Sequence, residues 1–304
     1  MRCSRVTKMK KKKIKWDELG FRLVGGLFVG GIAAVCLIPF VMLISGSFTS
    51  ESYILRNGYP LFPHNFSTEA YQFLMKSWKQ ILLAYKNSLV ITVVGTALGL
   101  FLTAMTGYVL SRKDFKWRNK FAFFFFFTTL FSGGLVPWYI VMTKIGVRNS
   151  LWSIILPNLL TVFNILIMRN FMLGIPKEII ESGKIDGAND FVIFIRLVLP
   201  VLKPALATIG LFLALAYWND WYHAMLFINK KSLFPLQYYL YDILNSAISM
   251  QKAMEGGSSA GFTIIPTYSA KLAMTVIATG PIVLVYPFIQ KYFIKGITVG
   301  AVKA

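Results

Sequence analysis

The stretch EIIESGKIDGANDFVIFIRLVLPVLKP, residues 178–204, interrupts a chain that otherwise consists mainly of long apolar runs. It holds four of the chain's twelve acidic residues, a glycine near its middle and a Leu-Pro pair near its end. Charged groups are costly inside a bilayer. We therefore expect this insert to lie in water, at the surface of a membrane domain built from the apolar runs.

The apolar runs are long enough to cross a membrane. The chain has 304 residues, of which 56% are hydrophobic, and several windows of 20 or more residues carry no charge. A helix needs ~20 apolar residues to span a bilayer. We expect an all-α integral membrane protein whose membrane domain, residues 23–294, contains six transmembrane helices. The expected spans are 23–44, 87–110, 121–142, 151–171, 204–227 and 270–293.

The basic residues predict the orientation of these spans. With the N-terminus inside, 22 of the 32 Lys and Arg residues lie on the inner side. Because cytoplasmic segments are enriched in Lys and Arg, both termini are expected in the cytoplasm. The basic segment 1–22, the insert loop 174–203 and the tail 295–304 then lie inside, and loops 47–84 and 228–268 lie outside. The outer loop's GGSSAG run, residues 256–261, favours a flexible tip.

Several classes of function are disfavoured by the sequence. The net charge of +20 is concentrated before the first span, which indicates orientation and contact with anionic membrane lipid rather than nucleic acid. The two cysteines and two histidines have no spacing typical of a disulfide framework, a metal site or a catalytic triad. No GxxxxGK[ST] phosphate-binding loop is present. We therefore expect no directly bound cofactor and no ATP hydrolysis by this chain.

Glycine and proline indicate where the expected helices weaken. Gly133, Gly134 and Pro137 weaken the second half of span three. Gly280-Pro281 and Pro287 are expected to break span six.

The local pattern of the insert predicts two short helices. The first has acidic residues near its N-terminus, and the pair Asp186-Gly187 is typical of a turn. Asn189 or Asp190 can cap the second helix, which the Leu199-Pro200 pair is expected to stop. The second helix presents the apolar positions Phe191, Phe194, Ile195 and Val198 on one face. An amphipathic connector lying on the membrane surface explains this pattern equally well.

The insert also resembles a known motif. Glu181-Ser182-Gly183-x3-Gly187-x9-Leu197-x-Leu199-Pro200 is similar to the EAA loop of ABC importer permease subunits, with Ser182 and Gly183 in place of two alanines and Leu197 in place of isoleucine. Further segments resemble the carbohydrate branch of that family, of the maltose-permease G-subunit type and its LplC/YtcP-like members. These are 185–188 (IDGA), 131–137 (FSGGLVP), 218–221 (WNDW) and 295–303 (KGITVGAVK).

The resemblance implies the ABC type I importer permease fold in the plasma membrane of a bacterium. It implies a heterodimer with a second permease subunit, two cytoplasmic ABC ATPase subunits that use the ATP, and an extracytoplasmic solute-binding lipoprotein. The insert would dock in a groove of an ATPase. The implied ATPase-coupling residues are Glu181, Ser182, Gly183, Asp186, Gly187, Ala188, Phe191, Phe194, Leu199 and Pro200.

The resemblance also implies that the solute is a carbohydrate, and an oligosaccharide is expected. An aromatic segment in span five offers translocation-path candidates, which are Trp218, Asn219, Asp220 and His223. Asp220 counts well inside that span, where a carboxylate is a functional candidate. An aromatic belt at the outer interface, with Asp220 pairing to another helix, is the structural alternative. A self-contained secondary transporter and an ABC permease for another solute are the alternative functions.

Overall fold

The computed structural model describes residues 16–255 and 266–301. Throughout these ranges the regular elements are helices, apart from one isolated bridge between Thr49 and Phe66. The basic block 1–15, the predicted flexible tip at 256–261 and the last three residues lie outside the described residues.

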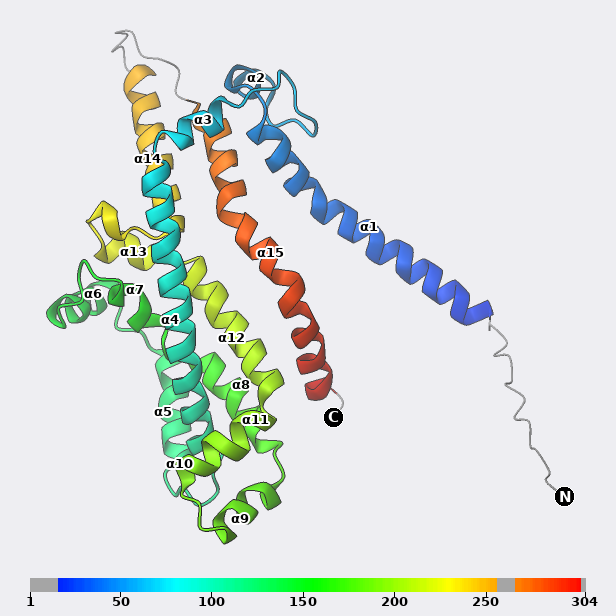
Figure 1. Ribbon diagram of the computed structural model, residues 1–304, viewed down its shortest axis with the longest axis vertical. Coiled ribbons are helices and arrows are strands. Elements are labelled where there is room, and N and C mark those ends of the chain that lie inside the picture. The colour runs from blue at the N-terminus through cyan, green and yellow to red at the C-terminus, as the bar shows by residue number, and fades with distance from the viewer. Residues whose placement is uncertain (1–15, 256–265, 302–304) are drawn as a thin grey trace.

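The helices follow the apolar runs of the sequence (Figure 1). In chain order they are α1 (Trp16–Ser47), α2 (Glu51–Asn57), α3 (Glu69–Met75), α4 (Trp78–Ser111), α5 (Arg118–Leu130), α6 (Leu135–Lys144), α7 (Trp152–Asn158), α8 (Val162–Leu173), α9 (Lys177–Ile185), α10 (Asp190–Ile193), a π-helical turn (Phe194–Val198), α11 (Leu199–Val201), α12 (Lys203–Trp218), α13 (Tyr222–Phe227), a 3-10 turn (Lys231–Leu233), α14 (Leu236–Glu255) and α15 (Thr267–Ala301).

The number of membrane spans depends on how bent helices are counted. Single helices over Leu23–Ser47, Trp78–Ser111 and Thr267–Leu284 are long and apolar enough to cross a bilayer. Three further candidates are helix pairs, bent by 117° between α5 and α6, by 49° between α7 and α8, and by 87° where Asp190–Val201 meets α12. The described residues therefore supply three spans, or up to six if each bent pair is one span.

Helix α4 forms the centre of the bundle, where it packs against α8 and α12 (Figure 1). Tyr217 of α12 is fully buried beside it, and its hydroxyl donates a hydrogen bond of 2.9 Å to the Ile155 carbonyl. Nearer the N-terminus of α4, the Asn87 amide donates to the Ser232 carbonyl at 2.9 Å, and Ser88 Oγ accepts from the Leu236 amide at 2.8 Å. These bonds attach the segment before α14 to α4.

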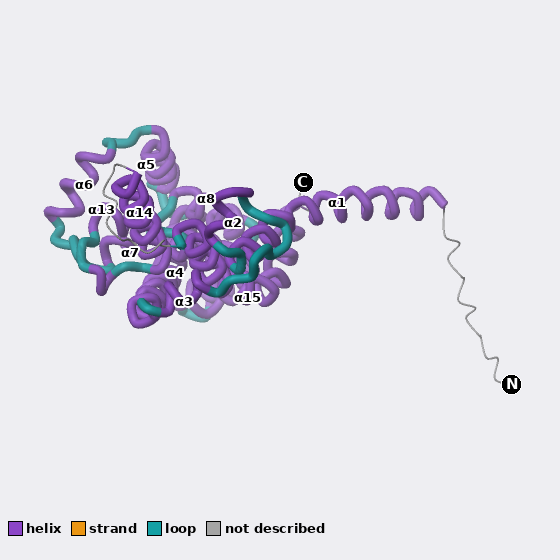
Figure 2. The backbone as a smooth tube through the Cα atoms, turned by 90° about the horizontal axis from the view of Figure 1, so that it is seen from above, coloured by secondary structure: helices purple, strands orange, loops and turns teal. Residues whose placement is uncertain are grey.

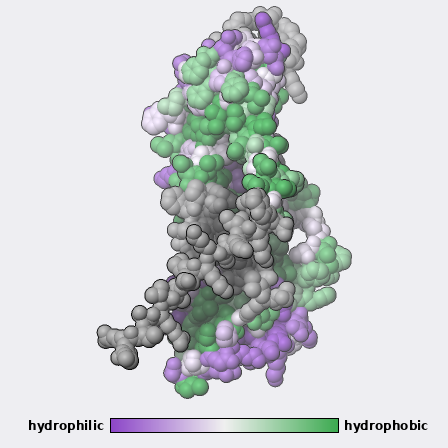
Figure 3. Space-filling view, turned by 90° about the vertical axis from the view of Figure 1, so that its right-hand side faces the viewer, coloured by the Kyte–Doolittle hydropathy of each residue, from purple (hydrophilic) through white to green (hydrophobic). Residues whose placement is uncertain are grey.

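Helix α1 packs against α15 but otherwise stands apart from this bundle. Figure 2 shows it extending away from the other helices, and its side chains from Leu23 to Val41 are mostly exposed. A space-filling view shows hydrophilic side chains mainly toward the two ends of the molecule and hydrophobic ones between them (Figure 3). The exposed apolar surface of α1 therefore needs lipid or another protein to cover it.

Helix α15 contradicts the prediction that span six is broken. It runs without interruption through Gly280, Pro281 and Pro287, and it includes residues 295–301, which were expected to form a separate tail. Pro281 has no N–H to donate to the Ile277 carbonyl, four residues earlier. The Tyr85 hydroxyl of α4 donates to that carbonyl instead. The bundle therefore satisfies a backbone group that would otherwise be left unpaired at this proline.

Replacing Tyr85 with phenylalanine is expected to lower stability by about 1 kcal/mol, because the Ile277 carbonyl loses its donor. The same change in a Pro281→Ala background is expected to have little effect, because the introduced alanine supplies a backbone N–H of its own. Thermal unfolding of the four purified variants in detergent measures the coupling. Equal losses in both backgrounds would contradict this account of the proline.

The outer segments are more helical than expected. The long segment 228–268 contains the 20-residue helix α14, and α4 begins at Trp78 rather than near Asn87. Glu51 of α2 reaches the first turn of α15, where its carboxylate accepts from the Tyr268 amide at 2.8 Å and from the Ser269 amide at 2.8 Å. This buried carboxylate caps the N-terminus of α15 from a part of the chain distant in sequence.

Candidate functional site

The polar insert folds as two helices joined by a tight turn. After α9, Gly187 adopts a left-handed conformation with φ of 76°. Its amide donates to the Lys184 carbonyl at 3.1 Å, and the Ala188 amide donates to the Gly183 carbonyl at 2.9 Å. These bonds satisfy carbonyls that the end of a helix leaves free. A side chain at residue 187 would be strained in this conformation, so the turn depends on glycine.

The second helix begins directly after Asn189. The Asn189 side chain accepts a hydrogen bond of 2.8 Å from the Val192 amide, so it is the N-cap. The prediction that Leu199-Pro200 stops this helix is confirmed to within one residue, because helical structure ends at Val201 and the chain then turns by 87° into α12. A π-helical turn, Phe194–Val198, directly precedes Leu199-Pro200. A widened turn relieves the clash of proline with the preceding helical turn.

The two helices of the insert touch at Gly183. A Cβ at that residue would lie 2.8 Å from Leu197 Cδ1 and 3.0 Å from Ile193 Cγ1. Alanine, the residue of the resembled motif, would therefore require these side chains to move.

The predicted coupling residues divide into an exposed set and a packed set. Glu181, Ser182, Asp186, Gly187, Phe191 and Pro200 are exposed, Ala188 and Leu199 are half-buried, and Gly183 and Phe194 are buried. The expectation that Phe191 and Phe194 share an outward face is wrong. Phe191 is 56% exposed, but Phe194 is 2% exposed and its ring lies 5.3 Å from that of Tyr108 in α4.

The most exposed apolar side chain of the insert was missing from the predicted set. Ile185, at the end of α9, is 85% exposed. Glu181, Asp186 and Phe191 are also exposed, and we call these four residues of the insert the coupling face. An exposed isoleucine and phenylalanine beside two carboxylates suit contact with another protein.

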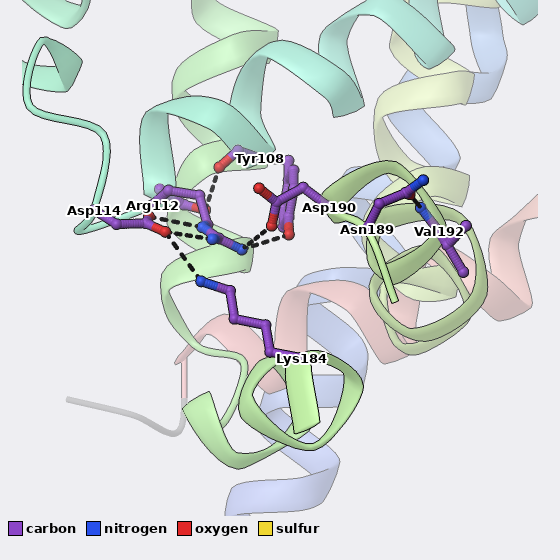
Figure 4. Close-up of polar contacts among 8 residues, drawn as sticks. Tyr108, Arg112, Asp114, Lys184, Asn189, Asp190 and Val192 are labelled. Carbon is purple, nitrogen blue, oxygen red and sulfur yellow. Dashed lines mark hydrogen bonds and ion pairs between the residues drawn. The ribbon is translucent and has the colours of Figure 1, made fainter. Parts of the chain in front are cut away.

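A cluster of charged residues ties the insert to α4 (Figure 4). Arg112 follows the last residue of α4 and is paired with Asp114, with a bond of 2.8 Å from Nε to Oδ1. The same guanidinium contacts Asp190 of α10 at 3.1 Å and donates to the Tyr108 hydroxyl at 2.8 Å. Lys184 of α9 reaches Asp114 at 3.3 Å. Helix α10 is therefore attached to Arg112 directly and α9 through Asp114, and the arginine side chain is 11% exposed.

The charges of this cluster reinforce one another. The hydrogen bond from Arg112 holds the pKa of Asp114 well below its usual range, against the opposing effect of desolvation. The bond to Asp114 likewise raises the pKa of Arg112. A carboxyl with a depressed pKa contributes stability above its unfolded pKa of about 4, and this is lost as the pH falls through the folded value. The Asp114–Arg112 pair is therefore fully charged at neutral pH.

Sequence reasoning missed this cluster. Its only local signal is Asp114, the single acid within the basic run 112–120. The partners Lys184 and Asp190 lie about 70 residues further along the chain, beyond the reach of any local pattern.

The structure brings together only part of the predicted translocation path. Asp220 lies in the break between α12 and α13 rather than inside a span, and it is 7% exposed. Its Oδ2 accepts from the Asn158 amide at 2.8 Å and contacts His223 Nδ1 at 2.5 Å. Its Oδ1 accepts from the His223 backbone amide at 3.1 Å. The pairing of Asp220 with another helix matches the structural alternative.

The other two candidates face elsewhere. Trp218 is buried, and its Nε1 donates to the Ala278 carbonyl of α15 at 3.4 Å. Asn219 is exposed and donates back to the Leu215 carbonyl at 3.0 Å.

Comparison with known proteins identifies the family. Residues 95–299 match the family described as the binding-protein-dependent transport system inner membrane component. LplC of Bacillus subtilis is 39% identical over 277 residues, covering 91% of this chain and 92% of that protein. The polygalacturonan/rhamnogalacturonan transport system permease protein YtcP of the same organism is 40% identical over 275 residues, covering 89% of this chain and 94% of that protein.

A solved structure has the same fold. A chain in the crystal structure of a bacterial ABC transporter involved in the import of the acidic polysaccharide alginate superposes with a TM-score of 0.76 and 28% identity, covering 93% of this chain and 100% of that chain. With the bent helices and the polar insert, these matches assign the chain to the inner membrane components of binding-protein-dependent ABC transport systems.

Proposed function

We propose that this chain is one permease subunit of an ABC importer for an oligosaccharide and forms half of its translocation pathway. The observation that carries the proposal is the 40% identity with YtcP over most of both chains. YtcP is described as a polygalacturonan/rhamnogalacturonan permease, and the more distant relative AraQ of Bacillus subtilis as an arabinooligosaccharide permease. The relatives therefore favour a carbohydrate over a non-sugar solute.

The insert, residues 174–203, is the proposed docking element for a cytoplasmic ATPase. Its coupling face presents Glu181, Ile185, Asp186 and Phe191 to the partner. Gly183 and Phe194 act from inside, because they hold the two helices against each other and against α4. ATP hydrolysis belongs to the ATPase, so this chain is a transport subunit rather than an enzyme.

The complete importer would contain a second permease subunit, two ATPase subunits and an extracytoplasmic solute-binding lipoprotein in the plasma membrane of a bacterium. The Lys and Arg bias supports a cytoplasmic location for both termini and the insert. The exposed apolar surface of α1 suits the second permease subunit and membrane lipid.

Reconstitution tests this proposal. The chain is purified with its partner permease and ATPase, placed in liposomes and supplied with its binding protein. Labelled oligogalacturonides, arabino-oligosaccharides and malto-oligosaccharides are offered with or without internal ATP. ATP-dependent uptake of at least one of them is expected. Uptake driven by an ion gradient without ATP would instead indicate a secondary transporter, and uptake of amino acids alone would exclude the carbohydrate assignment.

A further inference from the structure

The break between α5 and α6 opens into a cavity that has not yet been assigned a role in the proposed permease function. The cavity has a volume of about 550 Å³, and its lining includes Ser132, Gly133, Gly134, Trp138, Tyr222 and His223. Figure 1 shows α6 turned across the direction of α5, and the two helices meet at 117°. The cavity therefore lies between a broken span and the start of α13.

The backbone at this break needs polar partners. Residues 131–134 are exposed and not helical. Within the described part of the chain, no hydrogen bond is made to the carbonyls of Ser132 and Gly133. Helix α5 begins in the basic run 112–120, which we expect at the membrane surface, and its thirteen residues rise only about 20 Å. We therefore expect the break to lie inside a hydrocarbon core ~30 Å thick. Irregular backbone at that depth is tolerated only against protein or a water-filled cavity.

The cavity wall carries groups that suit a sugar. The ring of Trp138 lies edge-on to that of His223 at 5.3 Å, and Tyr222 lies edge-on to His223 at 5.9 Å. Aromatic rings offer an apolar face to the C–H surface of a pyranose, while the free carbonyls and the Tyr222 hydroxyl can bond its hydroxyl groups. A small number of polar groups among aromatic side chains is typical of a ligand site.

His223 is held in one orientation by Asp220. A carboxylate only accepts hydrogen bonds, so His223 Nδ1 donates to it and Nε2 is left for a ligand. Asn158 holds the same carboxylate oxygen from the end of α7. Asp220 and Asn158 are therefore positioning residues, and His223 presents a fixed hydrogen-bonding atom at the wall of the cavity.

From this geometry we propose that the cavity is an oligosaccharide-contacting subsite on this subunit, with Trp138 as the stacking residue and His223 as a hydroxyl-bonding residue. The inference rests on the proposed function and deepens it. The subsite keeps two of the predicted translocation-path residues, Asp220 and His223, and excludes the other two, Trp218 and Asn219. It adds Trp138, Tyr222 and the backbone of residues 132–134.

The test uses the complete reconstituted importer and the labelled oligosaccharide that the wild type transports. Trp138→Ala is expected to lower kcat/KM for uptake about tenfold, and Trp138→Phe is expected to retain most of it. ATPase activity stimulated by the binding protein reports that the complex is assembled. Trp152→Ala, on the exposed surface of α7, is the matched control and should transport normally.

A second measurement does not depend on the tryptophan. In a chain with Cys3 and Cys36 changed to serine, Ser132→Cys is expected to react with a membrane-impermeant maleimide. The transported oligosaccharide should slow that reaction. Unchanged uptake by Trp138→Ala, or a thiol introduced at residue 132 that is unreactive or not protected by sugar, would overturn the subsite. If the wild-type importer takes up no oligosaccharide, the proposed function fails instead.

Discussion

Replacing Gly187 with proline is expected to abolish recovery of the ATPase with this chain and to reduce ATP-dependent uptake by more than about tenfold. Proline is locked near a φ of about −65°, whereas this residue adopts a φ of 76°. The substitution also removes the amide that donates to the Lys184 carbonyl. The turn must therefore rearrange, and Ile185 and Phe191 would no longer lie on one docking surface.

Two further substitutions make this experiment specific. Gly187→Asn should retain much of the activity, because asparagine tolerates the left-handed conformation better than other side chains do. Lys177→Pro puts a proline in the same insert at the first residue of α9, where proline is compatible with a helix, and should behave like the wild type. Membrane insertion should be normal in all three. ATPase recovery by Gly187→Pro equal to wild type would refute docking through this turn.

Replacing Arg112 with alanine is expected to separate ATP hydrolysis from transport. The coupling face is untouched, so the ATPase should still be recovered. The insert, however, loses its attachment to α4 through Asp114, Asp190 and Tyr108. Both carboxylates are more than half exposed, so each ion pair contributes only about 0.2–1 kcal/mol. Losing the pairs together should lower the number of sugars moved per ATP several-fold, up to about tenfold.

Arg112→Lys is expected to give an intermediate result, because an ammonium keeps the charge but cannot bond two carboxylates with a planar fork. Lys116→Ala removes an exposed charge from the same loop without touching the cluster and serves as the control. Because the pKa of Asp114 is held low, coupling should not change over about pH 6 to 8. If Arg112→Ala moves as many sugars per ATP as the wild type, the cluster does not couple ATP hydrolysis to transport.

Local sequence patterns predicted the parts of the fold that depend on local chemistry. The apolar runs became helices, and span three breaks at the glycine pair where the sequence is weakest. Pro281 shows the limit of this reasoning. Whether a proline breaks a helix depends on whether the freed carbonyl finds another donor, and the donor here is Tyr85, 192 residues away in the chain.

The coupling face, too, could be predicted only in part from local patterns. The periodicity of the second insert helix identifies an apolar face but does not indicate which residues or partner that face contacts. Phe194 meets Phe101 and Tyr108 of the same chain, so it is part of the permease core. The charged cluster depends on two segments distant in sequence, 108–114 and 184–190, and only the folded chain brings them together.

Helix α4 has a further consequence, which follows from its length. Its 34 residues extend over about 51 Å, well beyond a bilayer core of ~30 Å, and no break divides it. Its N-terminal half holds the segment before α14 through Asn87 and Ser88, and its C-terminal end leads into Arg112. The neighbours α8 and α12 each belong to a bent pair, whereas α4 is continuous, so we expect movement at one end to reach the other. Coupling between two sites is reciprocal, so an external ligand that shifts α4 should also change affinity at the opposite membrane surface.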